Sequence, residues 1–233
     1  MIPKTIHYCW FGRGEMSAKS KKCLASWKKY CPDFEIIEWN EDNFDLDMNA
    51  YTRTTYANKQ YAFLSDYVRL WVVQQYGGIY LDTDVELIRP LDPLLSGHAY
   101  FGFENDEYVA TGLGFGAEAG APVLAAMLAE YEPLLDGEHG VIGCPKLNTA
   151  ALVGLGLQRN GQKQVIAGAT IYPADYFNPY DDPTGRLNCT ENTYSIHWYA
   201  KNWLSKREIL RSKLTRPFHR LFGVDCFRRW KNG

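Results

Sequence analysis

The sequence predicts an α/β fold, with a mostly parallel central sheet flanked by helices, and three observations support this prediction. Residues 2–39 alternate between strand-like, helix-like and strand-like segments, the usual opening of such a sheet. Residues 61–76 form a long apolar segment that is followed at once by a strand-like run. The length of 233 residues, 46 % of them hydrophobic, suits one compact domain.

The opening segment has clear start and stop signals for each of its elements. Residues 2–11 form the first strand-like run, and Gly12 frees the backbone for the turn that follows. Ser17 is a suitable N-cap for the helix, and Pro32 closes that helix. Residues 34–39 then form the second strand, which completes a β-α-β unit.

The segment YAFLSDYVRLWVVQQY, residues 61–76, is apolar on nearly every side of a helical wheel, so it predicts a buried helix of four turns. Gly77 ends the helix because glycine adopts the left-handed cap conformation without a side-chain clash. Asp66 and Arg69, its only charges, are neighbours on one face. They either pair with each other, or both point into a cleft where Asp66 accepts from sugar hydroxyls and Arg69 faces a phosphate or sugar oxygen.

The remaining chain up to residue 200 predicts further short elements. Strands are expected over residues 100–103 and 165–172, and helices over residues 121–131 and 147–155. The glycine-rich stretch 111–116 lacks the GxGxxG order and any following GK[ST], so we interpret it as backbone packing rather than a phosphate loop.

Composition excludes several classes of protein. With 25 Lys and Arg against 27 Asp and Glu, the chain is neither an acidic disordered segment nor a strongly basic nucleic-acid binder, and we expect no nucleic-acid partner. The 6 cysteines form no CxxC pair, which argues against a zinc site and favours reduced thiols. A signal-peptide pattern and an apolar run of about 18 residues are both absent, so a cytoplasmic location is expected.

Asp82-Thr83-Asp84 directly follows the apolar run of residues 79–81. Two residues apart on a strand are roughly 6.6 Å from each other and share a face, so both carboxylates could address one site. Mg²⁺ and Mn²⁺ prefer such oxygen ligands, and ligands of open α/β sheets bind beyond the carboxyl ends of strands. The simpler interpretation, a solvated turn, applies to most isolated DxD sequences.

The run AFLSDYVRLWVVQQYGGIYLDTDVELIRPLDPLL and the opening IPKTIHYCWFG resemble glycosyltransferase family 32. This family of DXD-motif sugar transferases includes yeast α-1,6-mannosyltransferase and enzymes of capsular polysaccharide synthesis. The block S-D-x-x-R-L followed by G-G-I-Y-L-D-T-D is far more specific than a bare DxD. The later segment YSIHWYAKNWL resembles the family more loosely.

The resemblance implies a GT-A fold, a single Rossmann-like nucleotide-binding domain that we assign to residues 1–204. It implies Mn²⁺ or Mg²⁺ as cofactor, a UDP- or GDP-sugar as donor, and a saccharide or lipid-linked acceptor. A hexose would be transferred with retention, in surface polysaccharide synthesis.

The resemblance also assigns roles to individual residues. Asp84 and Asp82 would hold the metal, Asp82 would also serve the ribose or sugar, and His197 would complete the metal shell, which would favour Mn²⁺ over Mg²⁺. For His197 the alternative is a satisfied core histidine, and for Trp10 plain core packing. The residues expected to be catalytic are Asp66, Arg69, Asp82 and Asp84, and those expected to bind the donor are Trp10, Asn40, Ser65, Asp66, Arg69, Tyr80, Asp82 and Trp203.

Two other functions fit parts of the sequence. A haloacid dehalogenase-like phosphohydrolase also places DxD after an apolar strand, but its pattern wants Thr or Val at the position of Glu86. A non-catalytic carbohydrate-binding protein is favoured by 16 Tyr and 7 Trp, whose flat faces suit sugars.

The C-terminal part changes character. Residues 201–233 contain ten Lys and Arg and two acidic residues, a net charge of +8, whereas the whole chain carries −2. We interpret residues 205–233 as a basic amphipathic extension. It either solubilises a helix or contacts the anionic inner face of a membrane where a lipid-linked acceptor waits.

Overall fold

The structure of the protein is a computed structural model that describes residues 1–200, 206–223 and 226. The helices are α1 (Ala18–Tyr30), α2 (Ala50–Ala57), α3 (Tyr61–Tyr76), α4 (Pro122–Ala129), α5 (Cys144–Gly154) and α6 (Lys206–Phe222). The strands are β1 (Thr5–Cys9), β2 (Glu35–Trp39), β3 (Gly78–Tyr80), β4 (Val85–Leu87), β5 (Ala99–Gly102), β6 (Phe115–Ala117), β7 (Gln164–Ile166), β8 (Ala169–Tyr172), β9 (Tyr180–Asp181), β10 (Arg186–Leu187) and β11 (Ser195–His197).

The central sheet has seven strands in the order β2-β1-β3-β6-β5-β8-β7. Strands β1, β2, β3, β5 and β8 run in one direction, while β6 and β7 run in the other. The prediction of a mostly parallel sheet is therefore confirmed. Two small sheets, β4 with β11 and β9 with β10, lie outside it.

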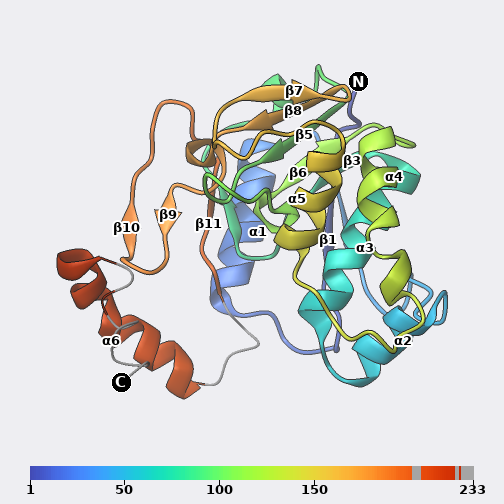
Figure 1. Cartoon of the computed structure of the whole chain (residues 1–233), viewed down its shortest axis with the longest axis horizontal. Coiled ribbons are helices and arrows are strands. Elements are labelled where there is room, and N and C mark those ends of the chain that lie inside the picture. The colour runs from blue at the N-terminus through green and yellow to red at the C-terminus, as the bar shows by residue number, and fades with distance from the viewer. Residues whose placement is uncertain (201–205, 224–225, 227–233) are drawn as a thin grey trace.

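Helices cover both faces of the central sheet (Figure 1). Helix α1 packs with β4 on one face, and α3, α4 and α5 pack on the other. Side chains of β3 and of the residue that follows it alternate between the two cores that result: Tyr80 enters the core under α3, whereas Ile79 and Leu81 enter the core under α1. The end of β3 is thus held between two buried layers.

Helix boundaries follow the signals in the sequence. The Ser17 side chain accepts a hydrogen bond from the Ser20 N–H at 3.0 Å and caps α1. Helix α3 spans the predicted residues, and Gly77 ends it with a positive φ of 67°. A Cβ at Gly78 would lie 2.7 Å from the carbonyl oxygen of Thr5, so only glycine allows β3 to start this close to β1.

The single strand predicted over residues 165–172 is wrong, because the structure forms a hairpin there. Strands β7 and β8 pair antiparallel across Ala167 and Gly168, whose φ angles are 45° and 79°. Two consecutive residues with positive φ form a tight turn whose twist matches that of the flanking strands. Alanine rarely adopts this conformation, so the sequence hid the turn.

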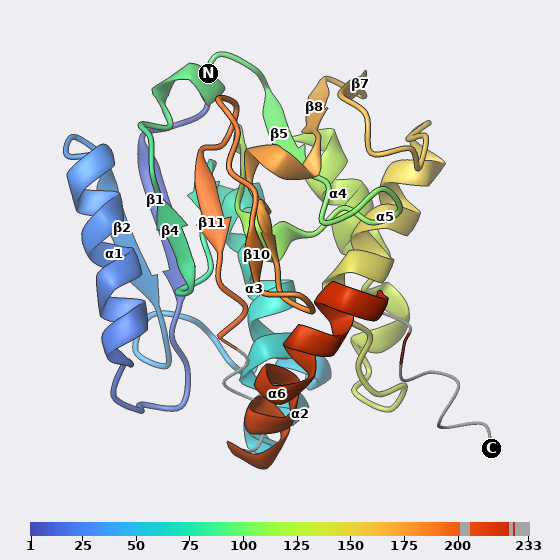
Figure 2. The ribbon, with the colours of Figure 1, turned by 90° about the vertical axis from the view of Figure 1, so that its left-hand side faces the viewer.

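Helix α6 lies beside the β9–β10 hairpin (Figure 2). Arg216 of α6 pairs with Asp182 at 3.1 Å, and Arg220 donates to the carbonyl oxygen of Gly185 at 3.2 Å. Within the described part of the chain, no helix combines the length and hydropathy needed to span a bilayer. The predicted domain boundary after residue 204 lies outside the described residues.

Candidate metal and sugar-binding site

Asp82 and Asp84 lie in a tight turn between β3 and β4, which the Val85 N–H closes by donating to the Asp82 carbonyl oxygen at 2.9 Å. The extended geometry assumed from the sequence is wrong, since β3 ends at Tyr80. The turn nevertheless brings the two carboxylates together. Ligand atoms of Asp82, Asp84 and His197 all lie within 4.8 Å of one another.

His197 reaches this turn because β11 pairs antiparallel with β4, which sets His197 opposite Val85. Its Nε2 lies 3.2 Å from Oδ1 of Asp84, and the Ala200 N–H donates to Oδ2 of the same carboxylate at 2.6 Å. Nδ1 of His197 is buried and has no hydrogen-bond partner among the described residues. An unpaired buried ring nitrogen is not typical of a satisfied core histidine, and the ligand role of His197 stays a prediction.

The donor set suits a hard divalent cation. Two ligands of one ion at about 2.1 Å can be no more than about 4.2 Å apart, so atoms within 4.8 Å need only small side-chain movements. Two carboxylates and an imidazole are an acceptable set for Mn²⁺ or Mg²⁺. These residues therefore fit the implied cofactor.

Arg69 bridges the carboxylates of buried Asp66 and half-buried Asp82. One guanidinium nitrogen lies 3.0 Å from Asp66 and 3.0 Å from Asp82, and the side chain is only 4 % exposed. The guanidinium also lies 4.9 Å from the ring centroid of Tyr80, whose hydroxyl donates to Asp82 at 3.1 Å. The structure shows the pairing of Arg69 with Asp66, and Arg69 also contacts the DXD turn through Asp82. The other alternative, contact of Asp66 with sugar hydroxyls and of Arg69 with a phosphate or sugar oxygen, stays a prediction.

Asp66 has a second partner that the sequence did not reveal. The backbone N–H of Cys144, the first residue of α5, donates to its carboxylate at 3.3 Å. A helix N-terminus favours negative charge, so α5 stabilises this buried acid. Pro145 could have marked the start of α5, because proline is common in the first helical turn.

The two carboxylates of the DXD turn have opposite pKa shifts. Burial, reinforced by the charge of Asp84, raises the pKa of Asp82 to about 6 despite the neighbouring Arg69. Burial would also raise the pKa of Asp84, but His197 and the Ala200 N–H lower it to about 2. A bound cation lowers the electrostatic repulsion between carboxylates that lie this close together.

Gly112, in the glycine-rich stretch 111–116, packs directly against Asp82 and Arg69. A Cβ at this position would lie 2.7 Å from Oδ2 of Asp82 and 3.1 Å from a guanidinium nitrogen of Arg69. The interpretation as packing missed this proximity, since no local pattern tells which partner a glycine approaches.

The other expected donor residues are scattered. Ser65 accepts at its carbonyl from Nε of Arg69 at 3.1 Å. Trp10 is half-buried and donates from Nε1 to Gly14 at 2.7 Å. Asn40 donates to Glu38 at 2.8 Å. Neither Trp10 nor Asn40 has a described contact with Asp66, Asp82 or Asp84, so their roles in donor binding stay predictions. Trp203 lies outside the described residues.

Comparison with known proteins shows what the chain is similar to. Residues 17–101 match the family described as "Glycosyltransferase sugar-binding region containing DXD motif". The fold is similar to that of the solved structure "PaToxG Glycosyltransferase", with a TM-score of 0.52 and 18 % identity over 66 % of this chain and 68 % of that one. The predicted GT-A fold is confirmed.

Curated relatives sharpen the comparison. The chain is 34 % identical over 105 residues to inositol phosphoceramide mannosyltransferase 3 of Schizosaccharomyces pombe, covering 40 % of this chain and 27 % of the relative. It is 29 % identical over 111 residues to mannosyl phosphorylinositol ceramide synthase SUR1 of Saccharomyces cerevisiae, covering 43 % and 27 %. The chain spans only about a quarter of the length of these relatives, and residues 17–101 are the part that matches the DXD family model.

Proposed function

We propose that the protein is a metal-dependent glycosyltransferase. It moves a hexose from a UDP- or GDP-sugar to a saccharide or lipid-linked acceptor, with retention, in surface polysaccharide synthesis. The observation that carries this proposal is the meeting of Asp82, Asp84 and His197 beside the Arg69 bridge. The family match over residues 17–101 supports it.

Each residue of the site has a distinct task in this proposal. Asp84 and His197, with Asp82, would hold Mn²⁺ or Mg²⁺, which when bound offsets the charge that develops on the departing diphosphate. Arg69 is almost fully buried between two carboxylates, which favours a positioning role over direct contact with phosphate. It fixes the orientation of Asp82 toward the cation and the sugar.

Asp66 is proposed to bind the sugar rather than to act as a nucleophile. Its carboxylate is held by Arg69 and by the Cys144 N–H, and burial raises its pKa. Retention at the anomeric carbon is supported by the family resemblance, and the anomeric configuration of the product, read by proton NMR, tests it.

A panel of UDP- and GDP-sugars tests the proposal. The wild-type protein should release the nucleoside diphosphate only with Mn²⁺ or Mg²⁺, and Asp84→Ala should abolish this release. Asp136→Asn, which removes an exposed acid elsewhere, should keep it. Full activity of Asp84→Ala would contradict the proposal. Hydrolysis of phosphomonoesters would favour a phosphohydrolase, and sugar binding without release would favour a carbohydrate-binding protein.

We also propose contact with the inner face of a membrane through α6, in a cytoplasmic setting that the free cysteines are compatible with. Its exposed apolar residues recur at helical spacing and are accompanied by exposed Arg207 and Arg211. Such a face suits anionic lipid. The apolar residues are Leu210, Leu214, Phe218, Leu221 and Phe222.

Vesicle sedimentation tests this contact. The full chain should sediment with vesicles of phosphatidylserine and phosphatidylcholine, and the double variant Leu214→Asp with Phe218→Asp should not. Val165→Asp, at a similarly exposed apolar residue on β7, is the matched control. Equal sedimentation of all three proteins would refute the membrane contact.

A further inference from the structure

A pocket of about 600 Å³ opens beside the cluster of proposed metal ligands, Asp82, Asp84 and His197. It is lined by residues from the loop after β5, from the β9–β10 hairpin and from the segment that follows β11. Tyr199 forms the wall between the pocket and the cluster, because it lines the pocket and its ring centroid lies 4.1 Å from that of His197. A molecule in the pocket would therefore lie next to the proposed metal ligands.

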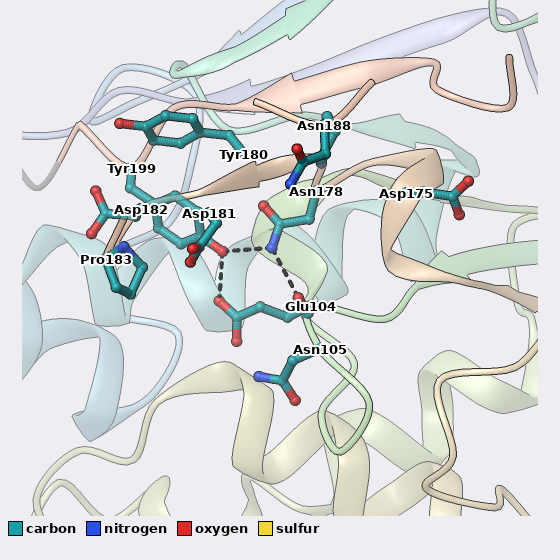
Figure 3. Close-up of a pocket in the computed structure, with 11 residues that line it drawn as sticks. Glu104, Asn105, Asp175, Asn178, Tyr180, Asp181, Asp182, Pro183, Asn188 and Tyr199 are labelled. Atoms are coloured by element: carbon teal, nitrogen blue, oxygen red, sulfur yellow. Dashed lines mark hydrogen bonds between the residues drawn. The ribbon is translucent and has the colours of Figure 1, made fainter. Parts of the chain in front are cut away.

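The wall is held in place by a small hydrogen-bond network, which Figure 3 shows at the centre of the pocket. The Tyr199 hydroxyl donates to Glu104 at 3.2 Å and accepts from Nδ2 of Asn178 at 2.8 Å. Tyr199 has a positive φ of 48°, an uncommon conformation for a bulky residue. The surrounding contacts maintain this conformation, so the wall is built rather than incidental.

The chemistry of the lining is specific. Four carboxylates line the pocket, those of Glu104, Asp175, Asp181 and Asp182, and the described lining residues include no Lys, Arg or His. Carboxylates accept hydrogen bonds from hydroxyl groups, amides both accept and donate them, and Tyr180 and Tyr199 add flat aromatic surface. Polyhydroxylated molecules are recognised by this combination. Phosphate or carboxylate groups would meet like charge.

We propose that this pocket binds the terminal sugar of the acceptor, and that this sugar is uncharged or carries an amino group rather than a phosphate or carboxylate. The inference rests on the proposed transferase function, and it names the substrate class that the cation site would serve. Because Tyr199 separates the pocket from His197, a sugar held there is next to the place where a donor would be activated.

Part of Asp182 is already engaged, since Arg216 of α6 pairs with it at 3.1 Å. Thr184 likewise donates to one oxygen of Asp181. Glu104 gives one oxygen to Tyr199, and its second oxygen has no partner among the described residues. Glu104 and Asp181 are the acids to change in a test, because their described hydrogen-bond partners are neutral hydroxyls, so the amide variants break no ion pair with a described residue.

Saturation-transfer NMR on the full chain measures the binding without any need for donor or metal. The probes are a methyl hexopyranoside, a methyl glucosaminide, a methyl glucuronide and a hexose 6-phosphate. The first two should bind, and the last two should bind at least about tenfold more weakly. Glu104→Gln and Asp181→Asn should weaken glucosaminide binding about tenfold, whereas Glu138→Gln, at an exposed loop acid, should not.

Preferential binding of the anionic probes, or glucosaminide binding unchanged in both pocket variants, would overturn the inference. Thermal unfolding of each variant shows whether it is folded, and Tyr199→Phe provides a second test in which the ring remains while the network is broken. Failure of the proposed function would look different. In that case the neutral sugars bind as expected, but no nucleotide sugar is cleaved with any metal.

Discussion

Two regions of the molecule meet at the proposed cation site, and they are held together in different ways. The first contains α3, β3 and the DXD turn, where charges are buried and paired within regular elements. The second runs from β9 to β11, where strands of two or three residues are joined by turns and aromatic contacts. The first region supplies Asp82 and Asp84, and the second supplies His197.

In the proposed function, this difference separates donor chemistry from acceptor chemistry. The first region lies within the residues that match the DXD family, whereas the strands of the second lie beyond residue 101. Substitutions within a buried network of ion pairs are strongly destabilising, because removing one partner leaves an uncompensated charge. Short strands and turns tolerate change, so the second region is suited to a pocket that varies with the acceptor.

The largest effect is expected from breaking the Arg69 bridge. Arg69→Met removes the cationic partner of buried Asp66 and of half-buried Asp82, and should lower the free energy of unfolding by about 3–5 kcal/mol. Arg216→Met removes a more exposed pair in the second region and should lower it by less than about 1 kcal/mol. Urea denaturation measures both. Similar losses of unfolding free energy in the two variants would show that the ion pairs of the first region are no more important for stability than that of the second.

The next effect concerns the approach of Gly112 to the DXD turn. Gly112→Ala places a methyl group 2.7 Å from Asp82 and should cost about 1–3 kcal/mol, with weakened Mn²⁺ binding. Gly154→Ala at the end of α5, where a Cβ meets nothing within 4 Å, is the control. Calorimetric titration with Mn²⁺ checks the binding. Unchanged affinity in Gly112→Ala would mean that Asp82 does not contribute to the site.

A pH effect should arise from His7 in the buried first region. Nδ1 of His7 accepts from Nε1 of Trp39 at 3.1 Å, and Nε2 donates to the Gly77 carbonyl oxygen at 2.9 Å, so the ring is neutral. Burial lowers its pKa below the ordinary 6.5. The unfolded chain therefore binds the proton first, and stability falls as the pH drops below about 6.5, by up to about 1.4 kcal/mol per pH unit.

Thermal unfolding between pH 5 and pH 8 checks this prediction against the variant His7→Gln. The variant should be less stable at neutral pH, because one or both hydrogen bonds are lost, and its stability should depend less on pH below 6.5. Parallel curves for the two proteins would contradict the assignment of the pH dependence to His7.

A small effect is also expected from Tyr199 in the second region. Tyr199→Phe removes the hydroxyl that contacts Glu104 and Asn178 and keeps the ring against His197. It should cost about 0.5–1.5 kcal/mol of stability. Differential scanning calorimetry measures it, and a loss as large as that of Arg69→Met would place Tyr199 among the essential supports of the fold.

The sequence predicted the first region well because its signals are local. Residues 61–76 show a continuous apolar helix with a glycine stop, and the structure has a helix with the same bounds. Asp66 and Arg69 are neighbours by helical spacing alone. The DXD carboxylates converge although the local backbone is a turn and not a strand.

The second region could not be predicted in the same way, since its geometry depends on non-local pairing. His197 reaches Asp84 only because β11 pairs with β4, more than a hundred residues earlier in the chain. The sequence indicated His197 at the site only through the family resemblance of YSIHWYAKNWL. Glu104 and Tyr199 meet across a similar separation, and no residue pattern predicts that contact. The turn at Ala167 and Gly168 was hidden for another reason, a positive φ at a residue that rarely adopts one.

The cation site is the central claim, and Mn²⁺ binding followed by electron paramagnetic resonance tests it most directly. With UDP or GDP present, the wild-type chain should remove one equivalent of Mn²⁺ from solution. Asp84→Asn should bind at least about a hundredfold more weakly, and Asp136→Asn as the wild type does. Absence of Mn²⁺ binding by the wild-type chain, or equal binding by Asp84→Asn, would contradict the account.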